Sequence, residues 1–430
     1  MPITDHYNPI WDTTRRSFPE RAYEDDDVIL ASNFECGNGY NFRKLPSGRY
    51  AVDIEPEPGD HHFSGSGCYF CFVALNKHDT PRTIAFDIRA QDASWDRQRR
   101  DRIETFLTEH PNEVPPLSFE GSSRFAIARS GDIWTHVPDD QMLRAIDYHG
   151  LAFSYDLPDG SEDHAATYFS NYHWYPYTEM TNYLKRQAEQ HPQITLFSLS
   201  KSVQDRDIWV VELGNASPDA PVIVCAATPQ ADEMGNWACR ANLEFLLSGT
   251  PEAEAILQRH RVCLIPHPNP DGAVLGYMVS DAADKFPYFM GAQTIAGDPE
   301  APIEQVALWK YLQQKRPWLF IEWHSNHWNW RPGHTLIRYA PELAENPVIR
   351  RIWDNWDRRL EALPNSFDEA GGRTDRTNAY TISLGLGVAT ELNGIPIMLK
   401  VHDKYPLHET LDYVNQCLRA ATDAYEEEIG

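Results

Sequence analysis

The chain has few cysteines and no long apolar run, and both absences narrow the class of protein. Its seven cysteines are scattered from Cys36 to Cys417 without a repeated spacing, which argues against a disulfide framework. Cys68 and Cys71 form a C-x-x-C in an apolar stretch with no second pair to complete a zinc knuckle, so we interpret them as core cysteines. No segment approaches the ~18 apolar residues of a membrane helix. With no apolar leader at the start, we expect a cytoplasmic protein.

Basic residues are also scarce. The 430 residues contain 38 Lys+Arg against 63 Asp+Glu, which gives a formal net charge of −25. Without a block of Lys and Arg, the chain lacks the charge pattern that nucleic acids or anionic membranes require. We therefore predict no nucleic-acid or membrane partner and expect a small-molecule or peptide substrate. The length suggests two domains, and the 42% hydrophobic content excludes disorder for most of the chain.

Residues 1–160 predict an all-β sandwich domain. Short apolar or alternating segments such as CYFCFVAL and TIAFDIRA recur from about residue 27 to 155. Turn-forming sequences such as PSG, EPGD and LPDG separate them at intervals typical of packed sheets. No group of potentially catalytic residues recurs at a regular spacing here.

Residues 161–430 predict an α/β domain. Apolar residues recur at helical spacing in YPYTEMTNYLKRQAEQHP, and strands alternate with helices from there to the C-terminus. The predicted strands include PVIVCAAT, HRVCLI, WLFIEW and GLGVATEL. This alternation indicates a mixed, mostly parallel sheet with helices on both faces. Ligands of such sheets bind beyond the carboxyl ends of the strands.

Side chains able to bind a metal or transfer a proton follow each of these four predicted strands. In chain order they are Gln230, Asp232 and Glu233; His267, Asn269 and Asp271; His324, His327, Arg331 and His334; and Glu391 and Asn393. A carboxylate and a histidine on adjacent strand ends, with a second carboxylate across the cleft, are the parts of a hydrolytic metal site.

Structural roles are alternatives for several of these residues. Glu233 can serve as an acid at a helix N-terminus, and His324 as a hydrogen-bonded residue at a strand end. Asn269 and Asp271, within NPDG, are typical of a turn. Glu391 is harder to explain structurally, because an unpaired carboxylate that ends an apolar strand is costly to bury.

Six segments, in this order, resemble one known family, the zinc metallocarboxypeptidases, and in particular its cytosolic carboxypeptidase branch. The segments are NFECGNGYNFRKL, YPYTEMTNYLKR, SVQDRDIWVVELG, NPDGAVLG, EWHSNHW and YTISLGLGVATELNG. They cover most of the chain from about residue 30 onward. The resemblance implies a carboxypeptidase-like α/β domain behind a β-sandwich, with zinc as the cofactor.

The resemblance also implies the residues of the site. The family's first two metal ligands form an H-x-x-E motif, and the corresponding loop here runs from Gln230 to Glu233. Glu233 takes the place of the carboxylate ligand, and Gln230 stands where a histidine is expected. His324 takes the place of the last metal ligand, and Glu391 that of the general base.

An alternative alignment, pinned on Trp237, moves Asp232 to the carboxylate position and Pro229 to the histidine position. We prefer the first alignment because it retains a glutamate and a side chain with a donor oxygen. A glutamine in place of the histidine changes the site, because an amide oxygen is a harder and weaker ligand than imidazole. Such a site would hold zinc less tightly, add a side chain such as Asp232, His267 or His327, or hold no metal.

A second departure from the family concerns the substrate. The segment GYMVSDAADKFPYFMGAQTIAGDPEAP contains no arginine, although the family binds the substrate's terminal carboxylate through arginines in this region. The substrate-binding candidates on other loops are Arg331, Arg376, His327 and Asn269, with Arg338 and Arg373 as further arginines. The negative net charge argues against a poly-acidic peptide substrate.

The leading hypothesis is a metal-dependent hydrolase that cleaves an amide or peptide bond, with Glu391 as general base and a small or modified amino-acid conjugate as a possible substrate. The alternative is a non-catalytic relative that binds a ligand in a degenerate metal pocket. A third arrangement uses His324 and His327 as H-x-x-H with Glu233, which requires the chain to turn after Ser325 because these histidines face opposite sides of an extended strand.

Overall fold

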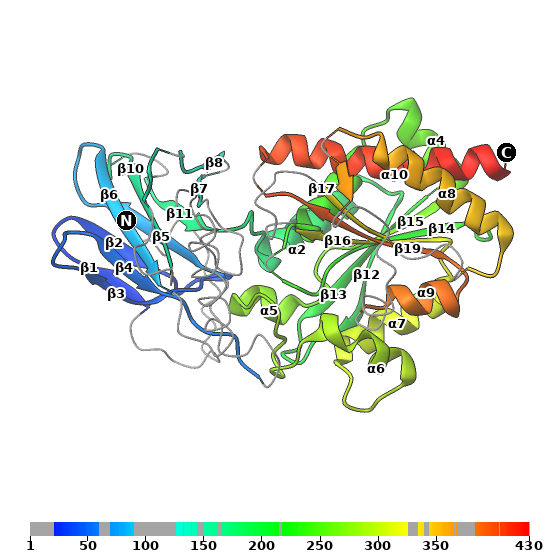
Figure 1. Ribbon diagram of the computed structural model, residues 1–430, viewed down its shortest axis with the longest axis horizontal. Helices are drawn as coiled ribbons and strands as arrows, with labels where there is room; N and C mark the ends of the chain where they lie inside the picture. Colours follow the sequence, from blue (N-terminus) through cyan, green and yellow to red (C-terminus); the bar gives the residue numbers. More distant parts are fainter. Residues whose placement is uncertain are drawn as a thin grey trace, which may run out of the picture. The chain divides into compact units, whose positions relative to one another are not determined.

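The computed structural model describes residues 21–59, 69–89, 126–131, 133–138, 140–143, 150–161, 165–214, 217–231, 233–325, 334–338, 344–364, 366–368, 383–403 and 405–429. These residues form two compact units (Figure 1). The first unit extends to Trp174 and also includes Gly272–Ser280. The second contains Tyr175–Asp271 and most of the chain from Asp281 onward. The boundary therefore lies at residue 174 rather than 160.

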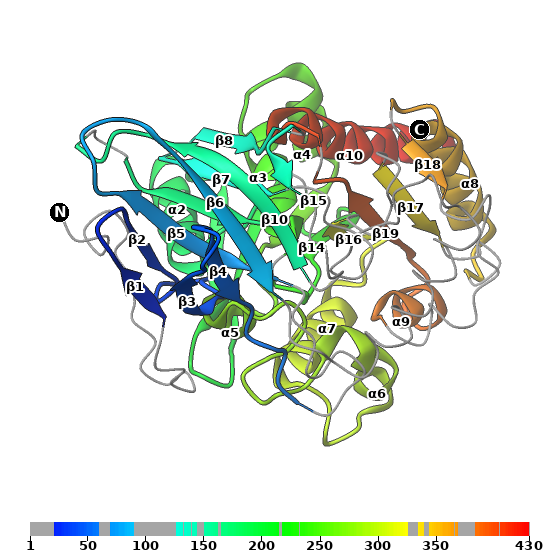
Figure 2. The ribbon, with the colours of Figure 1, turned by 60° about the vertical axis from the view of Figure 1, so that its left-hand side comes forward.

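The first unit contains two sheets. The six-stranded sheet has the order β1 (Ala22–Glu24), β2 (Val28–Ala31), β5 (Cys71–Asn76), β11 (Thr167–Ser170), β7 (Ile127–Ser130) and β8 (Ile133–His136). The five-stranded sheet has the order β3 (Tyr40–Lys44), β4 (Tyr50–Asp53), β6 (Arg82–Arg89), β10 (Gly150–Leu157) and β9 (Met142–Leu143). Figure 2 shows the long strands β6 and β10 side by side, paired antiparallel over their full length.

Both sheets contribute to one hydrophobic cluster in the first unit. Phe72 and Phe169, from the six-stranded sheet, contact Phe86 and Phe153 from the other sheet, with ring centroids 5.1 to 5.3 Å apart. Alternating residues of each strand supply this cluster, as the period-2 pattern of TIAFDIRA predicts. The predicted strands of this half of the chain are therefore present.

The segment Gly272–Ser280 packs within the first unit although it lies far along the sequence. It begins inside the short helix α5 (Pro270–Leu275). The buried Glu57 side chain accepts hydrogen bonds from the backbone N–H groups of Met278 (2.6 Å) and Ser280 (3.1 Å). Asn38 donates its side-chain amide to the carbonyl of Gly276 at 3.1 Å. The chain therefore leaves the second unit after Asp271, completes the first, and returns.

The second unit contains an eight-stranded mixed sheet with the order β12 (Ile194–Lys201), β13 (Asp207–Leu213), β15 (Arg261–Ile265), β14 (Val222–Ala227), β16 (Leu319–Ser325), β19 (Ile395–Val401), β17 (His334–Arg338) and β18 (Ser366–Asp368). The central strands β15, β14, β16 and β19 are parallel to one another. The predicted mixed, mostly parallel sheet is confirmed in this unit.

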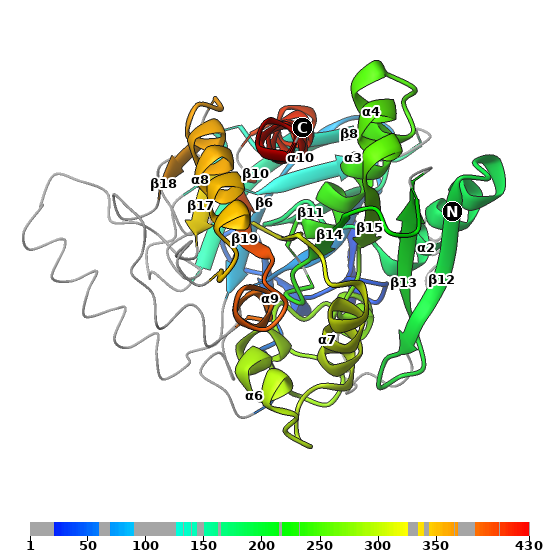
Figure 3. The same ribbon diagram turned by 90° about the vertical axis from the view of Figure 1, so that its right-hand side faces the viewer.

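Helices cover both faces of this sheet. The described helices of the unit are α2 (Tyr177–Gln190), α3 (Gly235–Leu246), α4 (Pro251–Arg259), α6 (Gly291–Ala296), α7 (Ile303–Lys315), α8 (Pro347–Glu361), α9 (Gly385–Thr390) and α10 (Leu407–Ile429), with a short 3₁₀ helix over Pro287–Met290. Figure 3 shows α3, α4, α8 and α10 on one face and α6, α7 and α9 on the other. None of the helices described is long and apolar enough to span a bilayer.

The segment GLGVATEL is a helix rather than the strand that its apolar pattern predicts. Its residues form α9, and the strand follows it as β19. A short apolar run cannot be assigned to helix or strand by periodicity alone. The helix packs closely on α7, because a Cβ atom at Gly387 would lie 2.4 Å from the Trp309 ring. Glycine allows the helix to approach α7 this closely.

Candidate metal centre

The candidate site lies at the carboxyl ends of the parallel strands of the second unit. Gln230 and Glu233 follow β14, and His324 is the penultimate residue of the neighbouring strand β16. All three residues are buried, and none has more than 6% of its surface exposed. The structure therefore places the predicted metal ligands at one edge of the sheet, the edge where ligands of such sheets bind.

Ser325 holds the loop after β14 against the end of β16. Its backbone N–H donates to Glu233 Oε2 at 2.8 Å, and its Oγ accepts from the backbone N–H of Met234 at 2.8 Å. Asn269 fixes the start of the same loop by donating its side-chain amide to the carbonyl of Pro229 at 3.0 Å. The position of Glu233 thus follows from the backbone of two adjacent strands.

The loop ends at Gly235, where α3 begins, and this glycine packs closely against the central strands. A Cβ atom there would lie 2.5 Å from the carbonyl oxygen of Trp323 and 2.7 Å from Cα of Ala227. Both atoms belong to the backbone of central strands, so neither can rotate away.

Gly235→Ala is therefore expected to lower the free energy of unfolding by about 2 kcal/mol, as overpacking of a core does. Chemical denaturation measures this loss. Gly249→Ala is not an equivalent substitution, because Gly249 has a positive φ of 70°. Glu244→Ala, which changes an exposed side chain of the same helix, is the control and should cost less than about 1 kcal/mol. An unchanged stability in Gly235→Ala would contradict the close packing.

Glu233 and His324 approach each other closely. The Nδ1 atom of His324 lies 2.9 Å from Oε2 of Glu233, and both side chains are completely buried. Neither ring nitrogen has an aligned hydrogen-bond partner, and Oε1 of Glu233 has no partner among the described residues. Buried polar atoms normally have partners. A buried carboxylate oxygen and an imidazole nitrogen left without one, on two residues in contact, fit the donor set of a divalent metal.

A second carboxylate flanks the same histidine. Oε2 of Glu322 lies 3.4 Å from Nε2 of His324, and the ring of Tyr288 packs edge-on at a centroid distance of 5.1 Å. Burial alone would lower the pKa of His324, but the charges and hydrogen-bonding capacity of Glu233 and Glu322 outweigh it and raise the pKa above its usual value. Two carboxylates thus flank the imidazole of His324.

Gln230, the third ligand of the predicted set, lies on the same loop as Glu233. Its backbone N–H donates to Thr228 Oγ1 at 3.3 Å, and its carbonyl accepts from the N–H of Glu233 at 3.2 Å, which keeps the two residues on one turn. Across the described part of the chain, no three His, Cys, Asp or Glu side chains are grouped as metal ligands. A third protein ligand would accordingly be a side chain of another type, such as Gln230, or come from outside the described ranges.

The prediction for Glu391 is corrected by its position. Glu391 directly follows α9 and is exposed, rather than ending a buried strand. It precedes Ile395, which pairs with Leu319 at the start of β16, whereas His324 pairs with Lys400 five residues further on. Glu391 therefore precedes the amino end of β19, whereas His324 lies opposite the carboxyl end of that strand.

The remaining predicted site residues either lie outside the described residues or have a structural role. Arg331, His327, Arg376 and Asp232 lie outside the described residues. Asn269 and Asp271 have the structural role that was one of their two interpretations. Asp271 accepts from Ser202 Oγ (2.7 Å), the N–H of Gln204 (2.8 Å) and the Arg206 guanidinium (2.7 Å).

His267, a suggested additional ligand, is buried, and burial lowers its pKa to about 3. It is therefore a neutral ring at physiological pH. The six described cysteines are all buried, and for Cys71 this agrees with the interpretation as a core residue; Cys68 lies outside the described residues.

The sequence interpretation missed Glu322 and Lys400. Glu322 precedes His324 by two residues on the same strand, so the E-x-H spacing alone places both side chains on one face of the sheet. Lys400 is the half-buried residue paired with His324 on β19. This pairing could not be seen without recognising β19 as a strand.

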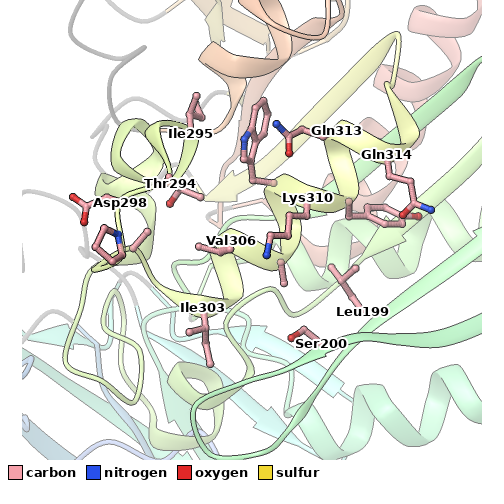
Figure 4. Close-up of a pocket in the computed structure, with 16 residues that line it drawn as sticks. Leu199, Ser200, Thr294, Ile295, Asp298, Ile303, Val306, Lys310, Gln313 and Gln314 are labelled. Carbon is pink, nitrogen blue, oxygen red and sulfur yellow. The ribbon is translucent and has the colours of Figure 1, made fainter.

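A separate open pocket of about 870 Å³ is lined by residues of α6, α7 and β12 (Figure 4). Ile303, Val306 and Lys310 of α7 line it, together with Leu199 and Ser200 of β12. Neither Glu233 nor His324 is among the lining residues. The pocket is therefore distinct from the candidate metal centre.

The chain is similar to zinc carboxypeptidases in both sequence and fold. Residues 180–284 match the family model described as zinc carboxypeptidase. The chain is 20% identical to cytosolic carboxypeptidase 2 of Macaca fascicularis over 270 residues, which is 59% of this chain and 30% of that protein. It is 30% identical to carboxypeptidase D of Rattus norvegicus over 146 residues, 32% of this chain and 10% of that protein. The chain thus spans less than a third of these curated relatives.

Two solved structures share the fold across nearly the whole chain. A metallo-carboxypeptidase from Burkholderia cenocepacia has a TM-score of 0.71 at 14% identity, covering 93% of this chain and 100% of its own. A metallo-carboxypeptidase from Pseudomonas aeruginosa has a TM-score of 0.71 at 17% identity, covering 93% and 99%. The resemblance predicted from the sequence is confirmed by these matches.

Proposed function

We propose that the chain is a metal-dependent hydrolase that cleaves an amide bond, with the metal held by Glu233 and His324. The observation that carries this proposal is the pair of unpartnered atoms, Oε1 of Glu233 and Nδ1 of His324, beside a 2.9 Å contact at the carboxyl ends of the sheet. A bound metal, zinc in the related family, supplies the polarisation of a carbonyl and a water whose pKa falls to roughly 7.

The chain's own residues prepare this site. Ser325 holds one oxygen of Glu233 and leaves the other to face the ion. Gln230 is the proposed third ligand and supplies a neutral oxygen. Complete burial of His324 keeps bulk water from competing for its ring nitrogen. With one carboxylate and one imidazole, these residues fit zinc, although the amide also suits harder ions.

The site also suggests what the substrate carries. Lys400 is paired with His324, and paired residues of adjacent parallel strands point to the same face of the sheet. Its ammonium group would pair with a substrate carboxylate, in a site that also holds the carboxylates of Glu233 and Glu322. We propose a small or modified amino-acid conjugate with a free carboxylate. An activity screen that pairs each free-acid amide with its carboxyl-blocked analogue tests this preference.

Zinc at 100 times its dissociation constant is expected to raise the free energy of unfolding by about 2.7 kcal/mol. Glu233→Gln should abolish most of this increase, because it replaces the only charged ligand of the pair. Thermal unfolding with zinc and with EDTA measures the effect. Glu304→Gln, another buried glutamate of the same unit, is the matched control and should respond to zinc as the parent does. An equal, flat response of the parent to zinc and EDTA would reject the hydrolase and favour a binding protein.

A further inference from the structure

Glu322 lies beside His324 but is not one of the proposed metal ligands. Its side chain is 7% exposed, and its Oε2 lies 3.4 Å from Nε2 of His324, at the outer limit of hydrogen-bond length. The same oxygen has no hydrogen-bond partner among the described residues. A buried carboxylate without a partner is costly, so this residue is informative.

Within the sheet, the polar side chain next to Glu322 is that of His324. The residues paired with Glu322 on the two adjacent strands are Ala226 and Met398, and neither offers a strong hydrogen-bond donor. Two positions further along β16, His324 points to the same face. The two ring nitrogens of His324 thus face different carboxylates, Nδ1 toward Glu233 and Nε2 toward Glu322.

We propose that Glu322 is a positioning residue that accepts the Nε2–H of His324 and so keeps the Nδ1 lone pair directed at the metal position. This inference rests on the proposed function, because it assigns the side of the ring that a metal would use. A neutral imidazole carries one proton, and the group that binds this proton fixes which nitrogen is free to ligate. Carboxylates in this relation typically improve metal affinity 10–100-fold by orienting the ring and making it more basic.

The first experiment compares zinc affinities by competition with a chromophoric chelator. Glu322→Leu is expected to bind zinc 10–100-fold more weakly than the parent, and Glu322→Gln to lose less, because its amide oxygen still accepts the Nε2–H. Glu304→Leu removes an equally buried carboxylate from the same unit and should leave the affinity unchanged. Equal affinities in the parent and Glu322→Leu would overturn the inference.

The second experiment remains decisive if Glu322→Leu fails to fold. Proton NMR of the parent, with and without zinc, should show a hydrogen-bonded Nε2–H of His324 far downfield, and Glu322→Gln should move it upfield. An Nε2–H that is unchanged in Glu322→Gln overturns the inference.

The two proposals can fail separately. If the parent binds no zinc, the proposed function fails, while the Nε2–H resonance of the metal-free protein still tests the role of Glu322. If the parent binds zinc and the Glu322 variants match it, only the role of Glu322 is rejected.

Discussion

Glu57→Leu is expected to lower the free energy of unfolding by about 4 kcal/mol. The carboxylate accepts from the backbone N–H groups of Met278 (2.6 Å), Val279 (3.4 Å) and Ser280 (3.1 Å), and from Ser280 Oγ at 2.8 Å. Leucine would leave these buried donors without an acceptor, and each buried unsatisfied donor costs roughly 1–3 kcal/mol. Burial raises the pKa of Glu57, although these donors oppose the rise.

Urea denaturation of the full chain measures this loss. Asp87→Asn is the control, because it removes a carboxylate of the same unit that is paired only with the partly exposed Arg89 at 3.0 Å. Such surface pairs contribute less than about 1 kcal/mol, so this variant should stay close to the parent. If Glu57→Leu were no less stable than Asp87→Asn, the hydrogen bonds to Gly272–Ser280 would not be what secures this segment.

Glu304→Gln is expected to become more stable relative to the parent as the pH rises, by up to about 3 kcal/mol between pH 5 and pH 8. Burial, together with the charges of Asp281 and Asp271, raises the pKa of Glu304 to about 7. One carboxyl oxygen accepts from the N–H of Val203 at 3.1 Å, and the other has no described partner.

The direction of this pH dependence follows from the raised pKa of Glu304. Below about pH 4.5 the carboxyl is protonated in both the folded and unfolded chain, and its contribution to stability is complete. As the pH rises toward 7, the unfolded chain releases the proton first, so this contribution is lost. The glutamine amide does not titrate and retains its stability.

Unfolding at pH 5 and pH 8 tests this pH dependence. Glu300→Gln, at a side chain with 82% exposure, is the control and should follow the parent at both pH values. A pH dependence of Glu304→Gln parallel to that of the parent would show that Glu304 titrates normally.

Much of the second unit is predictable from sequence because its elements are long and strongly periodic. The pattern of PVIVCAAT and WLFIEW identifies β14 and β16, and the adjacency of their ends brings Glu233 and His324 together. Both residues can be found because strand ends concentrate ligand-binding residues in such sheets. The pairing of β14 with β16 brings these two residues together, and it can be inferred without knowledge of side-chain packing.

The errors occur where packing overrides the local pattern. The apolar run Gly385–Thr390 is the helix α9, which packs against Trp309 at Gly387, and Glu391 therefore does not end a buried strand. Sequence alone cannot show this contact, because Trp309 is distant along the chain. The role of Gly272–Ser280 was likewise hidden, since its hydrogen-bond acceptor, Glu57, lies more than 200 residues away in the sequence.

The placement of Gly272–Ser280 also constrains how the chain folds during synthesis. Domains usually fold in order as they emerge from the ribosome, the N-terminal one first. Here the first unit cannot be completed until Ser280 has been made, by which time the first half of the other unit is already present. The first unit therefore cannot reach its native state before part of the other has been synthesised, and an exchange of one unit between related proteins would have to carry this nine-residue piece, Gly272–Ser280, with it.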